Sequence, residues 1–591
     1  MSIVTDIRDR VSRVLQEQFG FTATETDLPV NRTKPEFEGD YTLVLFALAK
    51  PLRKSPEQLG RELGAALTNG HRDLFTAFNV IKGFLNLSVA DAYWMTFLET
   101  HHADPRFGAR PANGQKVMVE YSSPNTNKPL HLGHLRNNFL GWSVARILEE
   151  TGCDVIKSCI VNDRGIHICK SMIAWERFSD GATPESTGIK GDHFVGDYYV
   201  KFSEVHKKET EALMAGGMDK ETAEKEAPIM KATQQMLIDW EAGKPDVIEL
   251  WKRMNGWVYQ GFEVTYRRIG SDFHKTYYES ETYLLGKRFV EEGLAQGVFF
   301  RKPDGSVWID LTSEGLDEKL VLRKDGTSVY ITQDLGLAQQ KYDEFRYDRS
   351  VYVIADEQNY HMKVLELILK KLGKPYASAI QHLSYGMVEL PTGRMKSREG
   401  TVVDADDLID EMVSVARQKT EELGKVKDFT DRELTELYDI LALGALKFYL
   451  LRVDPKKKMV FNPEESIDFH GFTGPFVQYT HARIRSILRK SDATIPPTSA
   501  APLLKLEREL LLQLEQYPTV IEQAAGEQDP SVIAGYVFNL ARAYNTFYTE
   551  HSVMNAETQE KKRLRLQLSH LTAQVIASGM ALLGIRVPER M

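Results

Sequence analysis

The segment from residue 117 to residue 161 constrains the fold of this chain more than any other. Val117 to Tyr121 is an apolar run typical of a buried strand, and Asp154 to Val161 is a second one. Between them, Leu132 to Glu150 carries apolar residues at helical spacing and stops at Thr151-Gly152. A strand, a helix and a second strand in this order predict a parallel sheet, whose ligands bind at the carboxyl ends of its strands.

The rest of the chain contains other recognisable stretches. Near Ile81 to Leu87 a strand-like run follows several helical segments, and Pro105 to Gly114 has the composition of a linker. Strand-like runs return at Val329 to Thr332 and at Val351 to Ala355. The charged, mostly helical stretch around 171–276 therefore reads as an insertion between two halves of the sheet.

These stretches predict several domains, because 591 residues are too many for one compact core. From about residue 429 onward, strand signals almost vanish. We expect an α/β protein that consists of a small N-terminal α/β domain at 1–107, a Rossmann-type parallel-sheet domain at 108–428 and an all-α domain at 429–591.

Cysteine usage and hydropathy exclude several classes of protein. The three cysteines, Cys153, Cys159 and Cys169, are too few for a disulfide framework or a four-cysteine zinc site. No apolar run approaches the roughly 20 residues of a membrane-spanning helix. Met1 to Arg10 carries acids and lacks the apolar core of an export signal. We expect a cytoplasmic protein without a membrane anchor and without a protein-bound metal.

The motif His131-Leu132-Gly133-His134 lies where the predicted helix begins. Histidines three residues apart face the same side of the first turn, and Gly133 leaves room for a nucleotide to approach the backbone. A helix N-terminus attracts phosphate, and imidazoles donate hydrogen bonds to phosphate oxygens as charge moves in a transition state. The structural alternative is a pair of histidines that only cap the helix.

The stretch from Glu120 to Asn137 resembles the first signature of the class I aminoacyl-tRNA synthetases, and its flanks are similar to the arginine-specific enzymes. The resemblance extends along nearly the whole chain. Tyr330 to Asp334 resembles the substrate strand of that family, Gln478 to Ile484 the start of its anticodon domain, and Ala543 to Tyr548 with Pro588 to Met591 its C-terminus.

The resemblance implies an ATP-dependent ligase that activates L-arginine as an adenylate and transfers it to tRNA(Arg) without a covalent enzyme intermediate. It also implies that activation requires bound tRNA. ATP would enter with Mg²⁺ as part of the substrate. Residues 1–107 would contact tRNA, residues 108–428 would catalyse, and residues 429–591 would bind the anticodon. We expect a monomer.

For ATP, the resemblance points to two stretches. The first holds His131, Gly133 and His134. The second, usually Lys-Met-Ser-Lys, is matched by Arg394, Met395, Lys396 and Ser397, where Ser397 stands at the position of the second lysine. Lys128 is assigned the displaced role of neutralising pyrophosphate, with Lys396 and Arg394 as competitors. His131, His134, Lys128 and Lys396 are therefore the predicted catalytic residues.

For arginine, a guanidinium with a fixed charge and five donors requires carboxylates, of which at least one is well aligned. The family pattern places the arginine-binding residues at Glu120, Asn125, Glu279, Tyr330, Asp334 and Gln358. For Asp334 the alternative is a helix N-cap before Leu335-Gly336.

For the anticodon, the family pattern points to Tyr479, Tyr544, Tyr548 and Met591. Tyr544 and Tyr548 are four residues apart, so both lie on one face of a helix, where aromatic rings stack on splayed bases. The alternative for both tyrosines is packing in a core.

Three other functions remain open at this stage. Another class I synthetase is one, although the chain is short for an enzyme with a large editing insertion and lacks zinc thiolates for a cysteine-specific one. A small-molecule nucleotidyltransferase would not explain the helical C-terminal third. A non-catalytic tRNA-binding paralogue would not need the intact His131, Gly133, His134 and Asp334.

Overall fold

The computed structural model describes the chain except for residues 1, 35, 390, 392–402, 425–427 and 492–501. Its centre is a five-stranded sheet in the order β12-β11-β5-β6-β7, and every neighbouring pair in it is parallel. The strands are β5 (Lys116–Glu120), β6 (Asp154–Val161), β7 (Lys275–Tyr278), β11 (Arg349–Ala355) and β12 (Ile380–Tyr385). Helix α5 (Leu132–Glu150) joins β5 to β6, as the sequence predicts.

The two faces of this sheet belong to two cores, which explains the unbroken apolar run of β5. Val117 and Val119 pack with α5, whereas Met118 between them packs in a second core with α14 (Tyr330–Phe345) and α15 (Asn359–Lys371). Because both faces are covered, successive side chains of the strand are all apolar.

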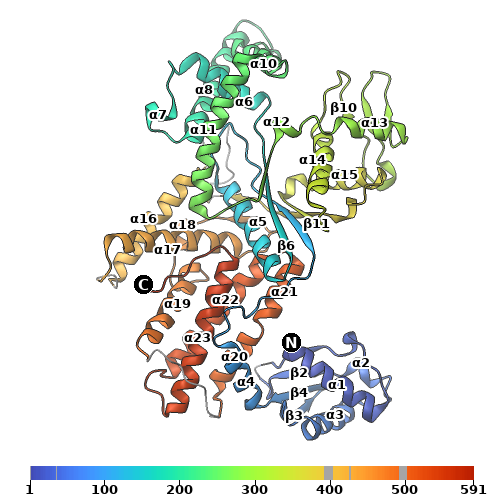
Figure 1. The fold of residues 1–591 in the computed structure, drawn as a ribbon, viewed down its shortest axis with the longest axis vertical. Helices are drawn as coiled ribbons and strands as arrows, with labels where there is room; N and C mark the ends of the chain where they lie inside the picture. Colours follow the sequence, from blue (N-terminus) through green and yellow to red (C-terminus); the bar gives the residue numbers. More distant parts are fainter. Residues whose placement is uncertain (1, 35, 390, 392–402, 425–427, 492–501) are drawn as a thin grey trace.

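The predicted insertion lies between β6 and β7 and is helical. It forms the upper end of the molecule in Figure 1. Its helices are α6 (Ile166–Phe178), α7 (Pro184–Thr187), α8 (Gly191–Ala215), α9 (Lys220–Glu226), α10 (Pro228–Glu241) and α11 (Pro245–Ile269).

A second, smaller lobe lies between β7 and β11 and carries the three-stranded antiparallel sheet β10-β9-β8. Its elements before α14 are α12 (Glu279–Thr282), α13 (Lys287–Ala295), β8 (Phe299–Arg301), β9 (Val307–Ile309) and β10 (Lys319–Leu322).

The strand predicted at Val329 to Thr332 is wrong, because these residues begin helix α14. Ile331, Leu335 and Ala338 are buried at helical spacing in the second core. The buried face of a 16-residue helix overrides the strand preference of a short β-branched run. Asp334 is not the N-cap either, since Val329 holds that position.

The chain then leaves the sheet and becomes helical. Two short strands, β13 (Val388–Glu389) and β14 (Met459–Val460), pair in parallel across this change. The helices are α16 (Ala405–Leu423), α17 (Asp431–Leu451), α18 (Pro463–Ser466), α19 (Gly474–Arg489), α20 (Lys505–Glu515), α21 (Tyr517–Glu527), α22 (Pro530–Glu550) and α23 (Gln559–Leu582).

The end of α23 reaches back to helix α5 of the central sheet. Ser143 of α5 donates a hydrogen bond to the carbonyl of Leu582 at 2.8 Å, and the buried Lys447 of α17 donates to that of Gly584 at 2.6 Å. The helical domain therefore buttresses α5 directly.

The N-terminal unit is a four-stranded antiparallel sheet in the order β1-β2-β4-β3, covered by helices. The expected run near Ile81 to Leu87 is a hairpin, whose turn at Lys82 and Gly83 has positive φ at both residues. The elements are α1 (Ile3–Phe19), β1 (Val30–Arg32), β2 (Tyr41–Val44), α2 (Phe46–Ala49), α3 (Pro56–Gly70), β3 (Phe75–Ile81), β4 (Phe84–Val89) and α4 (Asp91–His101).

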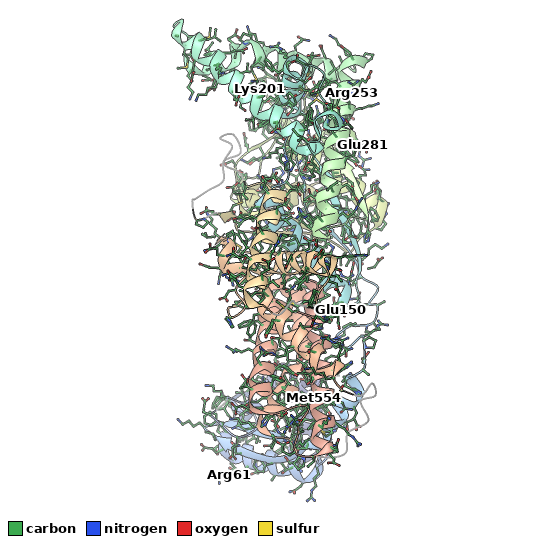
Figure 2. The ribbon with its side chains drawn as sticks, turned by 90° about the vertical axis from the view of Figure 1, so that its left-hand side faces the viewer. Arg61, Glu150, Lys201, Arg253, Glu281 and Met554 are labelled. Carbon is green, nitrogen blue, oxygen red and sulfur yellow. The ribbon has the colours of Figure 1, made fainter. Side chains whose placement is uncertain are left out.

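This unit docks on helix α20 of the helical domain, at the opposite end of the molecule from the insertion. Figure 2 shows Arg61 of the N-terminal unit at one end and Lys201 and Arg253 of the insertion at the other. At the junction Arg508 donates to Asp40 at 3.0 Å and to the carbonyl of Val89 at 2.9 Å.

Candidate active site

The carboxyl ends of the strands surround a cavity of about 1060 Å³. Glu120 ends β5, Glu279 directly follows β7, and Gln358 lies in the single turn after β11. Helix α14 presents one face to the cavity, with Tyr330 and Asp334 on it. All six residues predicted to bind arginine line this one cavity, namely Glu120, Asn125, Glu279, Tyr330, Asp334 and Gln358.

The turn after β5 is held in an unusual conformation beside this cavity. Ser122 and Ser123 both have positive φ, at 82° and 47°. Asn137 of α5 accepts a hydrogen bond from the backbone N–H of Ser122 at 2.6 Å and donates one to Val353 of β11 at 2.7 Å. The buried asparagine thus fixes a strained turn at the mouth of the site.

The three carboxylates predicted to bind arginine have different electrostatic surroundings. Glu120 is buried and ion-paired with the fully buried Lys341. Asp334 lies 2.6 Å from Nε2 of His361, and this hydrogen bond raises the pKa of His361. Burial raises the pKa of Glu279 to about 7, and the nearby Asp334 pushes it in the same direction.

Sequence reasoning missed the residues that support these carboxylates. Lys341 and His361 lie far along the chain from their partners, and no motif marks them. Arg164, whose guanidinium is centred 3.9 Å from the ring of Tyr283, also lines the cavity. The rule that ligands bind at strand ends could have flagged Arg164, because it follows β6 closely.

His131 and His134 both cap helix α5, so the structural alternative from the sequence is present in the fold. Nδ1 of His131 accepts from the N–H of Gly133 at 3.1 Å, and Nδ1 of His134 accepts from the N–H of His131 at 3.2 Å. A Cβ at Gly133 would lie 3.0 Å from the ring of His131, so a larger residue there would push against that ring.

Capping does not exclude a role for these histidines with a ligand. Burial lowers the pKa of His131 to about 3 and lowers that of His134 as well, so both rings are neutral near pH 7. A neutral imidazole whose Nδ1 accepts carries its proton on Nε2. Each ring therefore retains one N–H donor for an oxygen atom.

Lys128 lies in the loop that leads into α5. Its side chain is half-buried, burial lowers its pKa, and within the described parts of the chain no carboxylate pairs with it. Its positive charge also lowers the pKa of His131 and of His134. A half-buried cation without a counter-charge beside two N–H donors forms an environment that favours a phosphate.

The second predicted nucleotide stretch, with Arg394, Met395, Lys396 and Ser397, lies outside the described residues. The residues that follow it are described. The N–H of Leu132 donates to the carbonyl of Val403 at 3.2 Å, and the N–H of Ala405 donates to that of Leu130 at 2.9 Å. This pairing places Val403 to Ala405 against the loop that carries His131.

The predicted anticodon residues are only partly accessible. Tyr544 is fully buried and donates to or accepts from Ser569 at 2.9 Å, so a base cannot reach its ring, and its prediction as a stacking residue is wrong. Tyr548 is 38% exposed, and Arg483 lies near its ring and that of Tyr479. Met591 packs partly buried against the same core.

None of the helices in the described part of the chain combines the length and the apolar character that a membrane crossing requires.

Three family models match the chain. The model described as tRNA synthetases class I (R), catalytic domain, matches residues 100–462. The DALR anticodon binding domain matches residues 477–591, and the arginyl tRNA synthetase N terminal domain matches residues 5–89.

Curated relatives and solved structures agree with these models. Arginine–tRNA ligases of Amoebophilus asiaticus and Flavobacterium psychrophilum are each 51% identical to the chain, with 100% of both chains covered. The arginyl-tRNA synthetase structure from Thermus thermophilus covers 100% of both chains at 25% identity with a TM-score of 0.77. The Plasmodium falciparum structure, at 17% identity and a TM-score of 0.78, supports the fold.

Proposed function

The chain belongs to the arginyl-tRNA synthetases of class I, and from this premise we propose that it joins L-arginine to tRNA(Arg) at the expense of ATP. The observation that carries the proposal is the cavity at the strand ends, which the carboxylates of Glu120, Glu279 and Asp334 line. Helix α5, whose first turn His131 and His134 cap, follows the strand that ends in Glu120. The cavity offers a site for a cationic amino acid, and the N–H donors at the start of α5 offer one for a nucleotide.

We assign the guanidinium of arginine to Asp334 and Glu279. Lys341 already balances the charge of Glu120, so Glu120 contributes a hydrogen-bond acceptor rather than net charge. Asp334 and Glu279 lack a lysine or arginine ion pair, within the described residues. A fixed cation with five donors matches such a pair of carboxylates. Asn125 and Gln358 would hold the α-amino and carboxylate end, and Tyr330 would pack on the side chain.

Activation proceeds by attack of the arginine carboxylate on the α-phosphate of ATP, which releases pyrophosphate and leaves arginyl-adenylate. ATP enters as its Mg²⁺ complex, and the ion neutralises phosphate charge. Nε2–H of His131 and of His134 donates to phosphate oxygens, and Lys128 neutralises the charge that gathers on pyrophosphate. Lys396 and Arg394 remain candidates for the same task.

The terminal ribose hydroxyl of tRNA then attacks the mixed anhydride, and no protein nucleophile takes part. Burial supports this route, because the pKa of the buried thiols Cys159 and Cys169 is raised to about 12, where a thiolate is scarce at neutral pH. We propose that the enzyme acts as a monomer in the cytoplasm, with residues 1–107 and 429–591 contacting tRNA and residues 108–428 catalysing the reaction.

The decisive experiment is ATP–pyrophosphate exchange with each amino acid, measured with and without tRNA(Arg). Among the amino acids, only arginine should support exchange, and it should do so only when tRNA is present. Exchange with another amino acid would point to a different class I synthetase. Binding of tRNA without any exchange would point to a non-catalytic paralogue.

The substitution Asp334→Asn tests the arginine site itself. It removes the charge and keeps the shape, so the KM of arginine should rise by roughly 10²-fold, the effect of losing a charge-assisted pair in a shielded site. The KM of ATP, measured in the same exchange assay, should change little. Normal arginine kinetics in this variant would contradict the assignment.

A further inference from the structure

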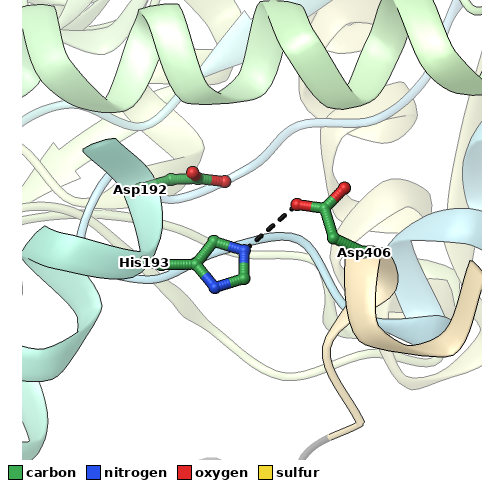
Figure 3. A group of neighbouring side chains, drawn as sticks. All are labelled: Asp192, His193 and Asp406. Atoms are coloured by element: carbon green, nitrogen blue, oxygen red, sulfur yellow. Dashed lines mark hydrogen bonds and ion pairs between the residues drawn. The ribbon is translucent and has the colours of Figure 1, made fainter. Parts of the chain in front are cut away.

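A network of charged and polar groups joins the insertion to the start of helix α16 (Figure 3). Asp406, in the first turn of α16, accepts a hydrogen bond from Nε2 of His193 at 3.1 Å and from Nζ of Lys190 at 2.6 Å. Lys190 also donates to the buried Asp192 at 3.0 Å and to Thr265 of α11 at 2.6 Å. Three helices, α8, α11 and α16, therefore meet at one carboxylate.

The residues of this network favour the ammonium group of Lys190 over a metal ion as the cation between its carboxylates. Asp192, His193 and Asp406 present ligand atoms close enough together to hold a metal. The ammonium group of Lys190, however, already lies between the two carboxylates, within 3.0 Å of each. Lysine thus supplies the positive charge that the acidic groups require. The close packing of α11 against Asp192 leaves little room, since a Cβ at Gly261 would lie 2.2 Å from its carboxylate.

Asp404, which lies two residues before Asp406 in the chain, connects this network to the loop that carries His131. Asp404 caps α16 by accepting from the N–H groups of Asp406 and Asp407, at 2.7 and 3.2 Å. The same Asp404 forms a β-bridge with His131, flanked by the backbone hydrogen bonds of Val403 and Ala405. The placement of Asp406 therefore fixes the strand-like segment that pairs with the His131 loop.

We propose that Lys190 and His193 are positioning residues that hold the start of α16, and through Asp404 the nucleotide loop, in the geometry needed for ATP activation. The inference rests on the proposed function of His131 and His134 in binding ATP. The proposal gives the insertion a role in the first reaction step. Residues of α8 and α11 hold Asp406, and Asp404 of the same segment pairs with the loop that carries His131.

The protonation of His193 provides a signature that simple packing would not show. The hydrogen bond to Asp406 raises the pKa of His193 above 6.5, and Asp404 and Asp192 act in the same direction. Lys190 and partial burial oppose the shift. On its own helix His193 also faces Asp197, whereas α11 contributes the uncharged Thr265. His193 is therefore a cation below its raised pKa, and the charged contact to Asp406 is lost as pH rises through it.

The first test is His193→Gln, which keeps an amide donor and removes the titratable charge. In ATP–pyrophosphate exchange with arginine and tRNA, we expect kcat to fall about tenfold and the KM of ATP to rise, as for the loss of one charged hydrogen bond. The KM of arginine should stay constant, because the residues that we assign to arginine binding lie on other elements. The ratio of wild-type to variant rate should be largest at about pH 6 and shrink toward pH 9.

Three further variants separate positioning from stability. Lys190→Met should show a larger loss of the same kind, and Lys190→Arg should recover most of it. Arg268→Met is the matched control, because the Arg268–Asp410 ion pair joins the same helices α11 and α16 at 2.6 Å but does not touch Asp404 or Asp406. It should leave ATP kinetics within twofold of the wild type.

Three outcomes would overturn the inference while leaving the enzyme's function intact: an equal loss in Arg268→Met, an equal rise in the KM of arginine and of ATP, or a rate ratio for His193→Gln that is independent of pH. Failure of Lys190→Met to fold would leave His193→Gln decisive, since that ring is partly exposed. Absence of arginine-dependent exchange in the wild type would instead refute the proposed function.

Discussion

Among single residues, Lys128 carries the most specific chemical expectation. It is a half-buried cation with no paired carboxylate among the described residues, and it lies close enough to His131 and His134 to lower their pKa. Lys128→Met should reduce the rate of arginine activation by roughly 10²-fold, the usual size of a lost transition-state contact. Affinity for tRNA, measured by filter binding, should change little.

Lys396→Met is the comparison for this prediction. If Lys128 replaces the lysine that Ser397 displaces, Lys396→Met should cost less than Lys128→Met. If Lys396→Met is inactive and Lys128→Met has normal activity, the second nucleotide stretch neutralises pyrophosphate without Lys128.

Glu279 predicts how arginine binding depends on pH. Its pKa of about 7 means that the carboxyl is protonated below this pH in the free enzyme. Only the carboxylate attracts a guanidinium, so a proton competes with arginine at acidic pH. Between about pH 8 and pH 6 the ionised fraction, and with it the contribution of Glu279 to binding, should fall about tenfold. The KM of arginine should rise accordingly.

Glu279→Gln provides the control, because it carries no titratable group. Its KM for arginine should be high and should depend on pH less than that of the wild type. The dependence that remains comes from His361, whose charge beside Asp334 opposes the guanidinium. A wild-type KM that falls with decreasing pH would contradict the assignment of Glu279 to the guanidinium.

The residues of the cavity could be predicted from the sequence where a motif or a family pattern marks them, and not otherwise. The six residues that the family pattern assigns to arginine binding line one cavity. Lys341 and His361 could not be predicted, because nothing local in the sequence links a lysine in one helix to a glutamate at the end of a distant strand. Their effect is nevertheless large, since Lys341 decides which carboxylate retains net charge.

At the scale of one element, two tyrosines of helix α22 differ in burial although the sequence predicts the same role for both. Tyr548 is partly exposed and lies near Arg483, whereas Tyr544 is sealed in the core. Tyr548→Ala should weaken tRNA binding by about 1–3 kcal/mol if a base stacks on its ring. Removal of Met591 should have a related effect, because it packs against the same core. Arginine and ATP kinetics should be unchanged.

Tyr544→Phe should behave differently from Tyr548→Ala. It removes only the buried hydrogen bond to Ser569, so the midpoint of thermal unfolding should fall while tRNA affinity stays normal. Equal losses of stability and of every activity in Tyr548→Ala would place Tyr548 in the core as well.

Elements with one unbroken pattern could be predicted closely, as the bounds of α5 and β6 show. Elements with mixed signals could not. Val329 to Thr332 has the composition of a strand, and only the packing of α14 against the second core makes it helical. A short window of sequence does not contain that information.

At the scale of the whole molecule, the junction between the N-terminal unit and α20 depends on Arg508. Asp40 is buried, and Arg508 supplies its counter-charge as well as a bond to the carbonyl of Val89. Arg508→Met should destabilise the junction by about 2–3 kcal/mol, because it leaves a buried carboxylate unpaired. Faster hydrogen exchange in α1 and β2 and a higher KM for tRNA should follow, with arginine and ATP kinetics intact.

Arg110→Met is a suitable control for the junction. Arg110 pairs with Glu522 of α21 at 2.6 Å, but both side chains are substantially exposed, so the pair contributes little. Unchanged hydrogen exchange in Arg508→Met would show that apolar packing alone holds the N-terminal unit in place.

The contact between α5 and the end of α23 has a consequence for biosynthesis. The residue that supports Ser143 is made 439 residues after it. At about 5–20 residues per second, a ribosome needs roughly 20 to 90 s to cover that distance. During this interval helix α5 is present without its contact to the end of α23. The enzyme therefore completes the support of this helix only at the end of its synthesis.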